Sequence, residues 1–220
     1  GDYGEEAMEL LDHFGVPVPR YQVAQDAGQA VQYAGKVGYP VVMKVVSPEA
    51  IHKSDAGGVL LGIRGPEQAK EAFRTIRNNL SSYNKKARFV GVRISAMAKD
   101  GLDMFIGAKQ DPSFGPVVFF GMGGVFIELF RDVAIALCPT SHDEVVKKIL
   151  QLRSSAMLKG YRGTGPSDTD AFVDAVVRVS HLMQKFPQIE EMDINPVRVF
   201  PKGQGILALD SRMRIGMVKE

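Results

Sequence analysis

Little in this sequence would cross-link the chain, insert it into a bilayer or attract it to a polyanion. A single cysteine, Cys138, among 220 residues excludes an intramolecular disulfide, which is usual for proteins of the reducing cytoplasm. The 27 Lys and Arg and the 25 Asp and Glu nearly cancel and are interspersed, so bulk charge indicates neither a nucleic-acid nor a membrane partner. The longest apolar runs fall far short of the ~20 residues that a membrane helix needs.

The N-terminus lacks an initiator methionine and begins with Gly1, Asp2 and Tyr3. It has neither the basic nor the apolar region of a secretory signal peptide. We therefore expect a processed product or a segment of a longer polypeptide, located in the cytoplasm.

The N-terminal part of the sequence predicts three helices, an extended segment at residues 16–24, where prolines favour extended backbone, and two further strands. Apolar residues recur at helical spacing in residues 5–15 and 27–38, and each segment ends at a glycine, as helices often do. The run YPVVMKVV (39–46) predicts a strand covered on both faces, and GVLLGI (58–63) predicts another. A third helix is expected to begin at Pro66, because proline is favoured in the first helical turn.

The centre of the sequence predicts a sheet. Short apolar runs separated by turn residues predict five strands, at residues 88–98, 102–110, 115–120, 125–130 and 132–139. Two helices are expected to follow, because Ser141 with Glu144, and Ser167 with Asp170, have the spacing of capping boxes.

Together these elements predict an α+β fold with two lobes. The first lobe is a small mixed α/β subdomain at residues 1–90, and the second is a larger, sheet-rich subdomain at residues 91–220. Nucleotides often bind between such lobes, although a fold alone does not assign a function.

Lys44 stands near the end of the otherwise apolar strand predicted at residues 39–46. Burial of an ammonium group without a partner costs several kcal/mol. Lys44 therefore either extends from the strand end to solvent or directs its charge at a bound phosphate.

The turn after this strand contains polar residues and two glycines: His52, Lys53, Ser54, Asp55, Gly57 and Gly58. The glycines allow backbone N–H groups to approach a ligand closely. His52, with a carboxylate three residues further on, is either a nucleophile with an orienting partner or a solvated turn residue.

A second glycine-rich segment, with Gly121, Gly123 and Gly124, separates two predicted strands. It is either a flexible loop that covers phosphates or a tight turn, and it fits neither the dinucleotide fingerprint nor the Walker phosphate loop. On the strand that follows, alternation places Glu128 on the same side as two phenylalanines. Glu128 is therefore either a metal ligand or a carboxylate in water at a sheet edge.

Residues 192–200 and 206–213 predict a C-terminal hairpin. Asp193 and Asn195 are two residues apart and share a face of its first strand, and Asp210 lies on the returning chain. A carboxylate with an amide oxygen suits Mg²⁺ shared with phosphates. The alternative is that Asn195 has a structural role and not a metal-binding one, because an Asn-Pro dipeptide also favours a turn.

Three long stretches, in this order, resemble the ATP-grasp subunit or domain of NDP-forming acyl-CoA synthetases. They are GYPVVMKVVSPEAIHKSDAGGV, DPSFGPVVFFGMGGVFIELFRDVA and EEMDINPVRVF with LALDSRM. That family comprises the ADP-forming acetate–CoA ligases, which are relatives of succinyl-CoA synthetase. The resemblance extends from near Gly4 to near Arg214, almost the whole chain.

The resemblance implies the reaction acyl-CoA + ADP + phosphate ⇌ acid + CoA + ATP, run through a phosphohistidine, with ATP/ADP and Mg²⁺ as cofactors. It implies that Lys44 contacts phosphate, that His52 relays the phosphoryl group, and that Arg162 lies near the γ-phosphate. It also implies further residues around the nucleotide: Ser95 and Met97 in the adenine pocket; Gly57, Gly58, Gly121, Gly123 and Gly124 about the phosphates; and Glu128, Asp193 and Asn195 as Mg²⁺ ligands.

The sequence departs from the family pattern at two places. Asp103 stands where relatives usually have glutamate, which retracts the carboxylate by one methylene group, about 1.5 Å. In VRISAM, Arg93 and Ser95 replace aliphatic or glutamine-type residues. Both departures bear on adenine binding and base choice.

The family resemblance also implies a partner, because this chain lacks the CoA-binding and primary phosphohistidine domains of a complete enzyme. The partner is an α subunit or fused domain that binds CoA and a carboxylic acid. One alternative is a regulatory or degenerate ATP-grasp module, for example one fused to an acetyltransferase. Another is an ATP-grasp carboxylate–amine ligase, whose chemistry gives no reason for His52.

Overall fold

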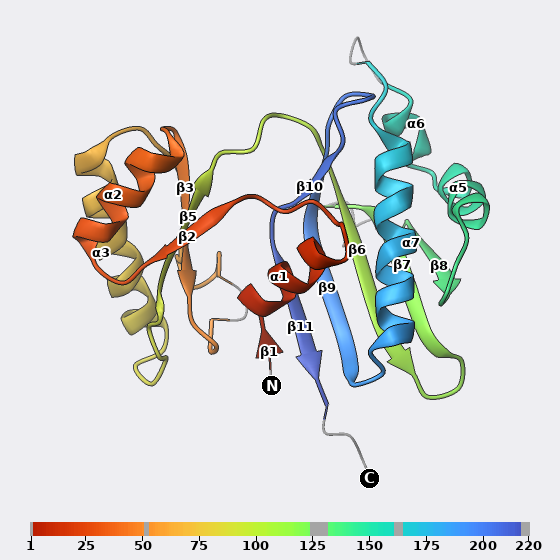
Figure 1. The fold of residues 1–220 in the computed structure, drawn as a ribbon, viewed down its shortest axis with the longest axis horizontal. Coiled ribbons are helices and arrows are strands. Elements are labelled where there is room, and N and C mark those ends of the chain that lie inside the picture. The colour runs from red at the N-terminus through yellow and green to blue at the C-terminus, as the bar shows by residue number, and fades with distance from the viewer. Residues whose placement is uncertain (1, 51–52, 124–131, 161–164, 217–220) are drawn as a thin grey trace. The chain divides into compact units, whose positions relative to one another are not determined.

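A computed structural model of the chain describes residues 2–50, 53–123, 132–160 and 165–216. The described residues form helices and antiparallel sheets, so the predicted α+β class is confirmed (Figure 1). Among the described helices, none combines the length and the apolar character that crossing a membrane requires.

The chain divides into two compact units. We call Pro19–Ala98 the small unit, and Gly1–Val18 together with Lys99–Glu220 the large unit. These units differ from the lobes expected at residues 1–90 and 91–220. The first strand and helix of the chain contact the last strand and therefore belong with the C-terminal sequence, whereas β5 pairs within the small unit.

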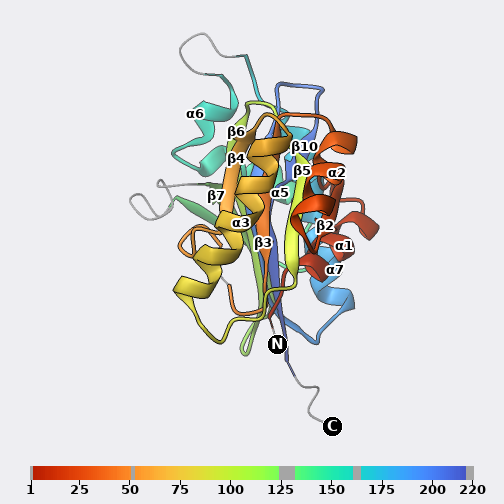
Figure 2. The same cartoon turned by 90° about the vertical axis from the view of Figure 1, so that its left-hand side faces the viewer.

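The small unit contains a four-stranded antiparallel sheet covered by two helices. In spatial order its strands are β2 (Tyr21–Ala24), β5 (Gly91–Ala96), β3 (Val41–Val46) and β4 (Val59–Ile63). The helices α2 (Ala27–Val37) and α3 (Pro66–Tyr83) lie side by side on one face (Figures 1 and 2). The core between them includes Met43, Val45, Phe73, Ile76, Leu80, Val92 and Ile94.

Because side chains alternate along a strand, the neighbours of these core residues point to the other side of the sheet. We call this side the opposite face of the small sheet. It carries Val42 and Lys44 of β3 and Arg93 and Ser95 of β5.

The large unit contains a seven-stranded antiparallel sheet. Its order is β1-β11-β9-β6-β7-β8, with β10 pairing β9 beside that path. The strands are β1 (Asp2–Tyr3), β6 (Leu102–Asp111), β7 (Gly115–Met122), β8 (Val133–Leu137), β9 (Ile189–Val199), β10 (Ile206–Ala208) and β11 (Ser211–Ile215). The predicted strand at residues 125–130 lies outside the described residues.

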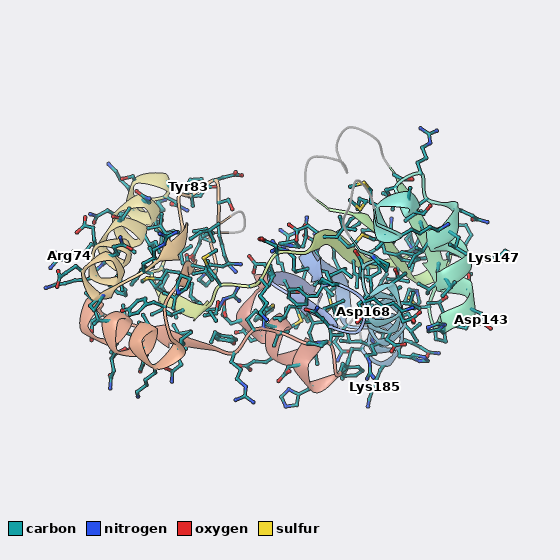
Figure 3. The ribbon with its side chains drawn as sticks, turned by 90° about the horizontal axis from the view of Figure 1, so that it is seen from above. Arg74, Tyr83, Asp143, Lys147, Asp168 and Lys185 are labelled. Carbon is teal, nitrogen blue, oxygen red and sulfur yellow. The ribbon has the colours of Figure 1, made fainter. Side chains whose placement is uncertain are left out.

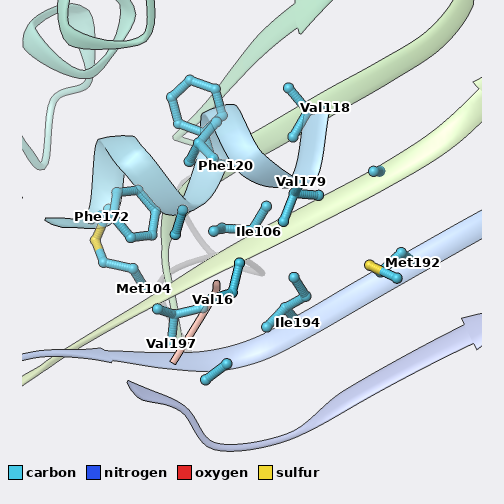
Figure 4. Packing of buried hydrophobic residues seen from close by; sticks show 14 of the residues in the cluster. Val16, Met104, Ile106, Val118, Phe120, Phe172, Val179, Met192, Ile194 and Val197 are labelled. Carbon is cyan, nitrogen blue, oxygen red and sulfur yellow. The ribbon is translucent and has the colours of Figure 1, made fainter. Parts of the chain in front are cut away.

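The helices of the large unit gather on one face of its sheet. They are α1 (Glu5–His13), α5 (His142–Gln151), α6 (Ser155–Leu158) and α7 (Thr169–Lys185). Figure 4 shows the core beneath α7, where Phe172 and Val179 meet Met104 and Ile106 of β6 and Phe120 of β7. The side turned away from these helices is the opposite face of the large sheet.

The predicted helix starts are confirmed for α5 and corrected for α7. Ser141 accepts a hydrogen bond from the Glu144 N–H at 3.3 Å, as expected of an N-cap. In α7 the cap is Asp168 rather than Ser167, because the Asp168 carboxylate serves two donors: the N–H groups of Ala171 at 3.4 Å and Gly205 at 2.7 Å. Asp168 and Lys185 mark the two ends of this helix in Figure 3.

Asp132, which precedes β8, holds the segment between α5 and α6. Its two carboxylate oxygens accept from the backbone N–H groups of Arg153 at 2.9 Å and Ser154 at 2.7 Å. Burial acts to raise the pKa of Asp132, but the hydrogen bonds from Ser154 and Arg153 outweigh it, so the pKa lies below its ordinary value. The ionised form therefore stabilises the fold at neutral pH.

We predict that Asp132→Asn lowers the free energy of unfolding by about 1–2 kcal/mol at pH 7, because asparagine offers one neutral acceptor oxygen in place of two charged ones. A carboxyl with a depressed folded pKa stabilises above its unfolded pKa and loses that effect as the pH falls through its folded pKa. Urea denaturation should therefore show a difference at pH 7 that shrinks and is lost in acid, as the carboxyl is protonated. Asp174→Asn on the exposed side of α7 is the control; a difference that persists in acid would contradict the role given to the charge.

Candidate functional site

Lys44 lies in the middle of a row of residues that crosses the small sheet. Its Cα partners are Val59 on β4 and Arg93 on β5, and Arg93 is in turn paired with Val23 on β2. All belong to the opposite face, away from α2 and α3. Lys44 is half-buried and Arg93 is only 3% exposed. The row therefore brings two cationic side chains to adjacent positions on one face.

The end of β5 carries the predicted adenine-pocket residues. Ser95 is buried on the opposite face, where its Cα partners are Val42 and Tyr21. Met97 follows the strand with an exposed side chain, and its backbone N–H donates to the Pro40 carbonyl at 3.2 Å. That backbone N–H is therefore engaged within the small unit, and the Met97 contribution to a ligand is limited to its carbonyl and side chain.

The glycines of the first polar turn have structural reasons of their own. Gly57 has φ +59°, and its carbonyl accepts from the Asn79 side chain of α3 at 2.8 Å. A Cβ on Gly58 would come within 2.4 Å of Val45. The turn therefore packs against both α3 and β3, and these contacts fix the backbone position of the residues that follow His52.

Gly121 and Gly123 also sit where backbones approach each other closely. A Cβ on Gly121 would lie 2.4 Å from the Asp132 carbonyl oxygen, and one on Gly123 would lie 3.1 Å from that of Asp103. The Gly123 N–H donates to the same Asp103 carbonyl at 2.8 Å. Gly121, in β7, and Gly123, just after it, are therefore both packed closely against neighbouring backbone.

Asp193 and Asn195 flank Ile194, whose side chain lies in the core of the large unit. Alternation therefore turns Asp193 toward the opposite face of the large sheet. Asn195 is exposed and lies where the pairing of β9 with β6 shifts register, between Ile194 and Val197. Asp193 is paired with Gly107 of β6 and with Arg212 of β11. The Asn195 N–H donates to the Asp210 carbonyl at 3.2 Å, so the backbone of the hairpin's returning chain lies beside the Asp193–Asn195 segment.

Asp103 forms a bidentate ion pair with Arg198. The Arg198 Nε donates to Asp103 Oδ1, and Nη2 donates to Oδ2 at 3.3 Å. Arg198 also donates from Nη1 to the Lys99 carbonyl at 2.8 Å. Gly101 packs closely against it, since a Cβ there would lie 2.7 Å from Arg198 Cδ. The Arg198 side chain therefore anchors residues 99–103 to β9 through these bonds to Lys99 and Asp103.

Four predicted site residues, His52, Gly124, Glu128 and Arg162, lie outside the described residues. Within the described part of the chain, no three Asp, Glu, His or Cys side chains gather as a metal site would require. Burial raises the pKa of the Cys138 thiol to about 12, which removes this cysteine as a nucleophile at neutral pH.

The sequence patterns missed two features of these faces. Arg93 lies over the Tyr21 ring in a cation–π contact, with its guanidinium carbon 5.4 Å from the ring centroid. Arg198 binds Asp103 across 95 residues of sequence. Neither pairing has a local signature, because each depends on strand register. Only the unusual arginine within VRISAM could have drawn attention to the first.

Comparisons of the sequence and of the structure with known proteins indicate the same family. The family model described as "ATP-grasp domain" matches residues 3–215. The chain is 42% identical to the β subunit of ADP-forming acetate–CoA ligase I of Pyrococcus furiosus, over 94% of this chain and 89% of that subunit. It is 43% identical to the ADP-forming 4-hydroxybutyrate–CoA ligase of Nitrosopumilus maritimus, over 97% of this chain. This chain spans only 30% of the length of that ligase.

A solved structure gives the same result. It is the dinucleotide-forming acetyl-coenzyme A synthetase 1 of Ca. Korarchaeum cryptofilum, in complex with coenzyme A, Ca-AMPCP and HgCl⁺. The TM-score is 0.94 at 36% sequence identity, and the match covers 98% of this chain and 93% of that one.

We predict that Arg198→Met loosens residues 99–103, because it removes a charged pair and a bond to a carbonyl. The amide hydrogen exchange of a peptide that spans this segment should accelerate about tenfold, the effect of losing ~1.4 kcal/mol of local protection. Peptides from α7 should not change. Arg214→Met is the control, since the exposed Arg214 pairs with Glu190 and Glu191 instead. Unchanged exchange in Arg198→Met would show that other contacts hold the segment.

Proposed function

The chain belongs to the ATP-grasp family, as the ATP-grasp part of the ADP-forming acyl-CoA ligases, and on this premise we propose that it binds MgATP and transfers its phosphoryl group. The overall reaction is ATP + carboxylic acid + CoA ⇌ acyl-CoA + ADP + phosphate, through a phosphohistidine. The observation that carries the proposal is 42% identity, over 94% of this chain, to a protein named as an acetate–CoA ligase subunit.

Lys44 is proposed to bind the phosphates. It extends from the opposite face of a sheet whose other face is closed by two helices, so its ammonium group is held by a rigid element. A cation fixed in advance near transferring phosphoryl oxygens stabilises the charge of the transition state without reorganisation. Gly57 and Gly58 support the phosphate site indirectly, through the turn that follows His52.

Asp193 and Asn195, with Glu128, are proposed to hold Mg²⁺. The set of two carboxylates and one amide oxygen is the hard-oxygen chemistry that this ion prefers, and two of the three lie two residues apart on β9. When bound, the ion would neutralise phosphate charge. The protein residues then have to position the nucleotide and exclude water, which is most of the catalysis in phosphoryl transfer.

The remaining roles are proposed from the resemblance of the sequence to the family. Ser95 and Met97 are proposed to border the adenine pocket, and Asp103 is proposed to contribute to nucleotide binding. His52 is proposed to accept and pass on the phosphoryl group, with Arg162 near the γ-phosphate. Gly121, Gly123 and Gly124 are proposed to form the strand end and loop that border the phosphates.

The CoA and acid sites are proposed to lie on a partner, either an α subunit or a fused domain. One relative of similar length is named a β subunit, and this chain spans 30% of the longer ligase. A cytoplasmic location is part of the same proposal, since CoA and ATP are supplied there.

A regulatory module is the second candidate, favoured by one observation. Both oxygens of the Asp103 carboxylate accept hydrogen bonds from Arg198. The carboxylate that would bind adenine is therefore already engaged within the protein. Turnover in the presence of the partner distinguishes this candidate from a working ligase.

We predict that calorimetric titration of the chain with ATP or ADP gives saturable, Mg²⁺-dependent binding. Lys44→Met should weaken it more than tenfold, because a charge-assisted contact to phosphate is lost. Lys70→Met, on the exposed side of α3, is the matched control and should bind as the unaltered chain does. Equal affinity in both variants would remove Lys44 from the site.

We predict that His52→Ala abolishes acyl-CoA formation by the complete ligase, partner included, while nucleotide affinity changes less than threefold. A relay residue is needed for transfer and not for binding, so the two measurements separate. His142→Ala, at the exposed start of α5, is the control. Normal turnover by His52→Ala would end the relay assignment.

A further inference from the structure

The helix-covered side of the small unit contains a pocket of about 440 Å³ between the start of α2 and the middle of α3. Its lining residues come from these two helices and the N-cap of α2: Asp26, Ala27, Phe73, Arg74, Arg77 and Asn78. A pocket of this size holds a small organic molecule. It lies on the other side of the sheet from Lys44, so the proposed nucleotide site does not account for it.

Two arginines give the pocket its charge. Arg74, labelled in Figure 3, and Arg77 are three residues apart on α3, so their side chains are neighbours on the helix surface. Both are exposed, and within the described part of the chain neither guanidinium forms an ion pair or a hydrogen bond. Like charges at this spacing destabilise a helix slightly. An anion in the pocket would relieve that repulsion and take up donors from both groups.

Arg77 is held in place by a short series of ring contacts. Its guanidinium carbon lies 5.6 Å from the centroid of the Phe89 ring, within the range of a cation–π contact. Phe89 in turn meets Phe73 edge-on, with the ring centroids 5.6 Å apart, and Phe73 belongs to the core of the small unit. The contact restricts the movement of Arg77, so less side-chain entropy is lost when it binds an anion.

Asp26 adds a requirement of the opposite charge. Its Oδ1 accepts from the Gln29 N–H at 2.8 Å, and the Gln29 side chain accepts from the Gln25 N–H at 2.9 Å, which caps α2. Oδ2 accepts no hydrogen bond from the described residues. A carboxylate oxygen repels an anion unless the ligand also presents a hydrogen-bond donor to it. The pocket therefore suits an anion that carries hydroxyl groups.

Phosphate matches the arginine pair better than carboxylate does. A phosphate monoester carries a charge of about −1.5 to −2 near pH 7, against −1 for a carboxylate, and arginine binds its oxygens through paired N–H donors. The pocket also has room for more than the phosphate group. Asn78 can donate to a phosphate oxygen or to a hydroxyl and can accept from a hydroxyl.

We propose that this pocket binds a small sugar phosphate, with Arg74 and Arg77 on the phosphate and Asp26 accepting from a sugar hydroxyl. The site goes beyond the proposed function and does not depend on it, because its residues are on α2 and α3 and not on the opposite face of the sheet.

The test is calorimetric titration of the whole chain with glucose 6-phosphate, inorganic phosphate and glucose, without nucleotide. Glucose 6-phosphate should bind saturably, inorganic phosphate at least threefold more weakly, and glucose without measurable heat. Arg74→Met and Arg77→Met should each weaken glucose 6-phosphate about tenfold, because a charge-assisted contact is lost. Lys70→Met, one turn earlier on α3 and outside the pocket, is the matched control and should bind as the unaltered chain does. Absence of saturable binding up to about 10 mM would overturn the proposal.

Asp26→Asn tests the role of the carboxylate. Asparagine caps a helix as well as aspartate does, so the fold is retained, but an NH₂ donor replaces the second acceptor oxygen. Inorganic phosphate should bind equally well or more tightly, since a negative charge is removed. The advantage of glucose 6-phosphate over inorganic phosphate should fall at least threefold. An unchanged advantage would exclude Asp26 from the site.

The place of binding is tested by amide chemical shifts. Glucose 6-phosphate should shift signals from residues 26–28 and 73–78, and Arg74→Met should abolish these shifts while changing MgADP affinity less than twofold. If the shifts instead cluster around Lys44 and persist in Arg74→Met, the sugar phosphate occupies the nucleotide site and this inference is overturned, while the proposed function stands. If the chain binds no magnesium nucleotide but binds glucose 6-phosphate through Arg74, the proposed function fails and this inference stands.

Discussion

Alternation of side chains along antiparallel strands, with helices packed on one face, is the constraint on which the rest of this structure depends. In each unit one face of the sheet is committed to the core, so every second residue of a strand is available for another purpose. Lys44 and Asp193 each follow directly from this rule, because their neighbours Met43, Val45, Met192 and Ile194 are core residues. The chemistry of the proposed function is therefore placed by the same periodicity that builds the fold.

Register adds what periodicity does not contain. The opposition of Lys44 and Arg93, and the pairing of Asp103 with Arg198, arise between strands that are distant in sequence. A one-residue slip in either ladder would turn these side chains to the other face. Hydrogen bonding across the whole sheet fixes both pairings, so no local sequence pattern predicts them.

The sequence was sufficient for most of the described helices and strands, including the Lys44 strand and the C-terminal hairpin, because each has strong local patterning. It did not predict the short β1 and α6. It was insufficient where two neighbouring residues could both cap a helix, as at the start of α7. There Asp168 rather than Ser167 is the cap, because its carboxylate accepts from two N–H donors. The glycines show a further limit. Gly58 and Gly121 suit a phosphate loop by composition, yet close packing against Val45 and the Asp132 carbonyl is sufficient to require them. His52, Glu128 and Arg162, which lie outside the described residues, remain predictions.

The interleaving of the two units in sequence has a consequence for how the chain is made. The small unit is continuous and is complete once Ala98 has been synthesised, so it can form its sheet and helices while the rest is still being translated. The large unit has to wait, because β1 pairs with β11, with Asp2 opposite Arg214. Its first strand and helix remain without their sheet until β11 has emerged. The small unit can therefore fold before the large unit, although the N-terminal segment of the large unit is synthesised first.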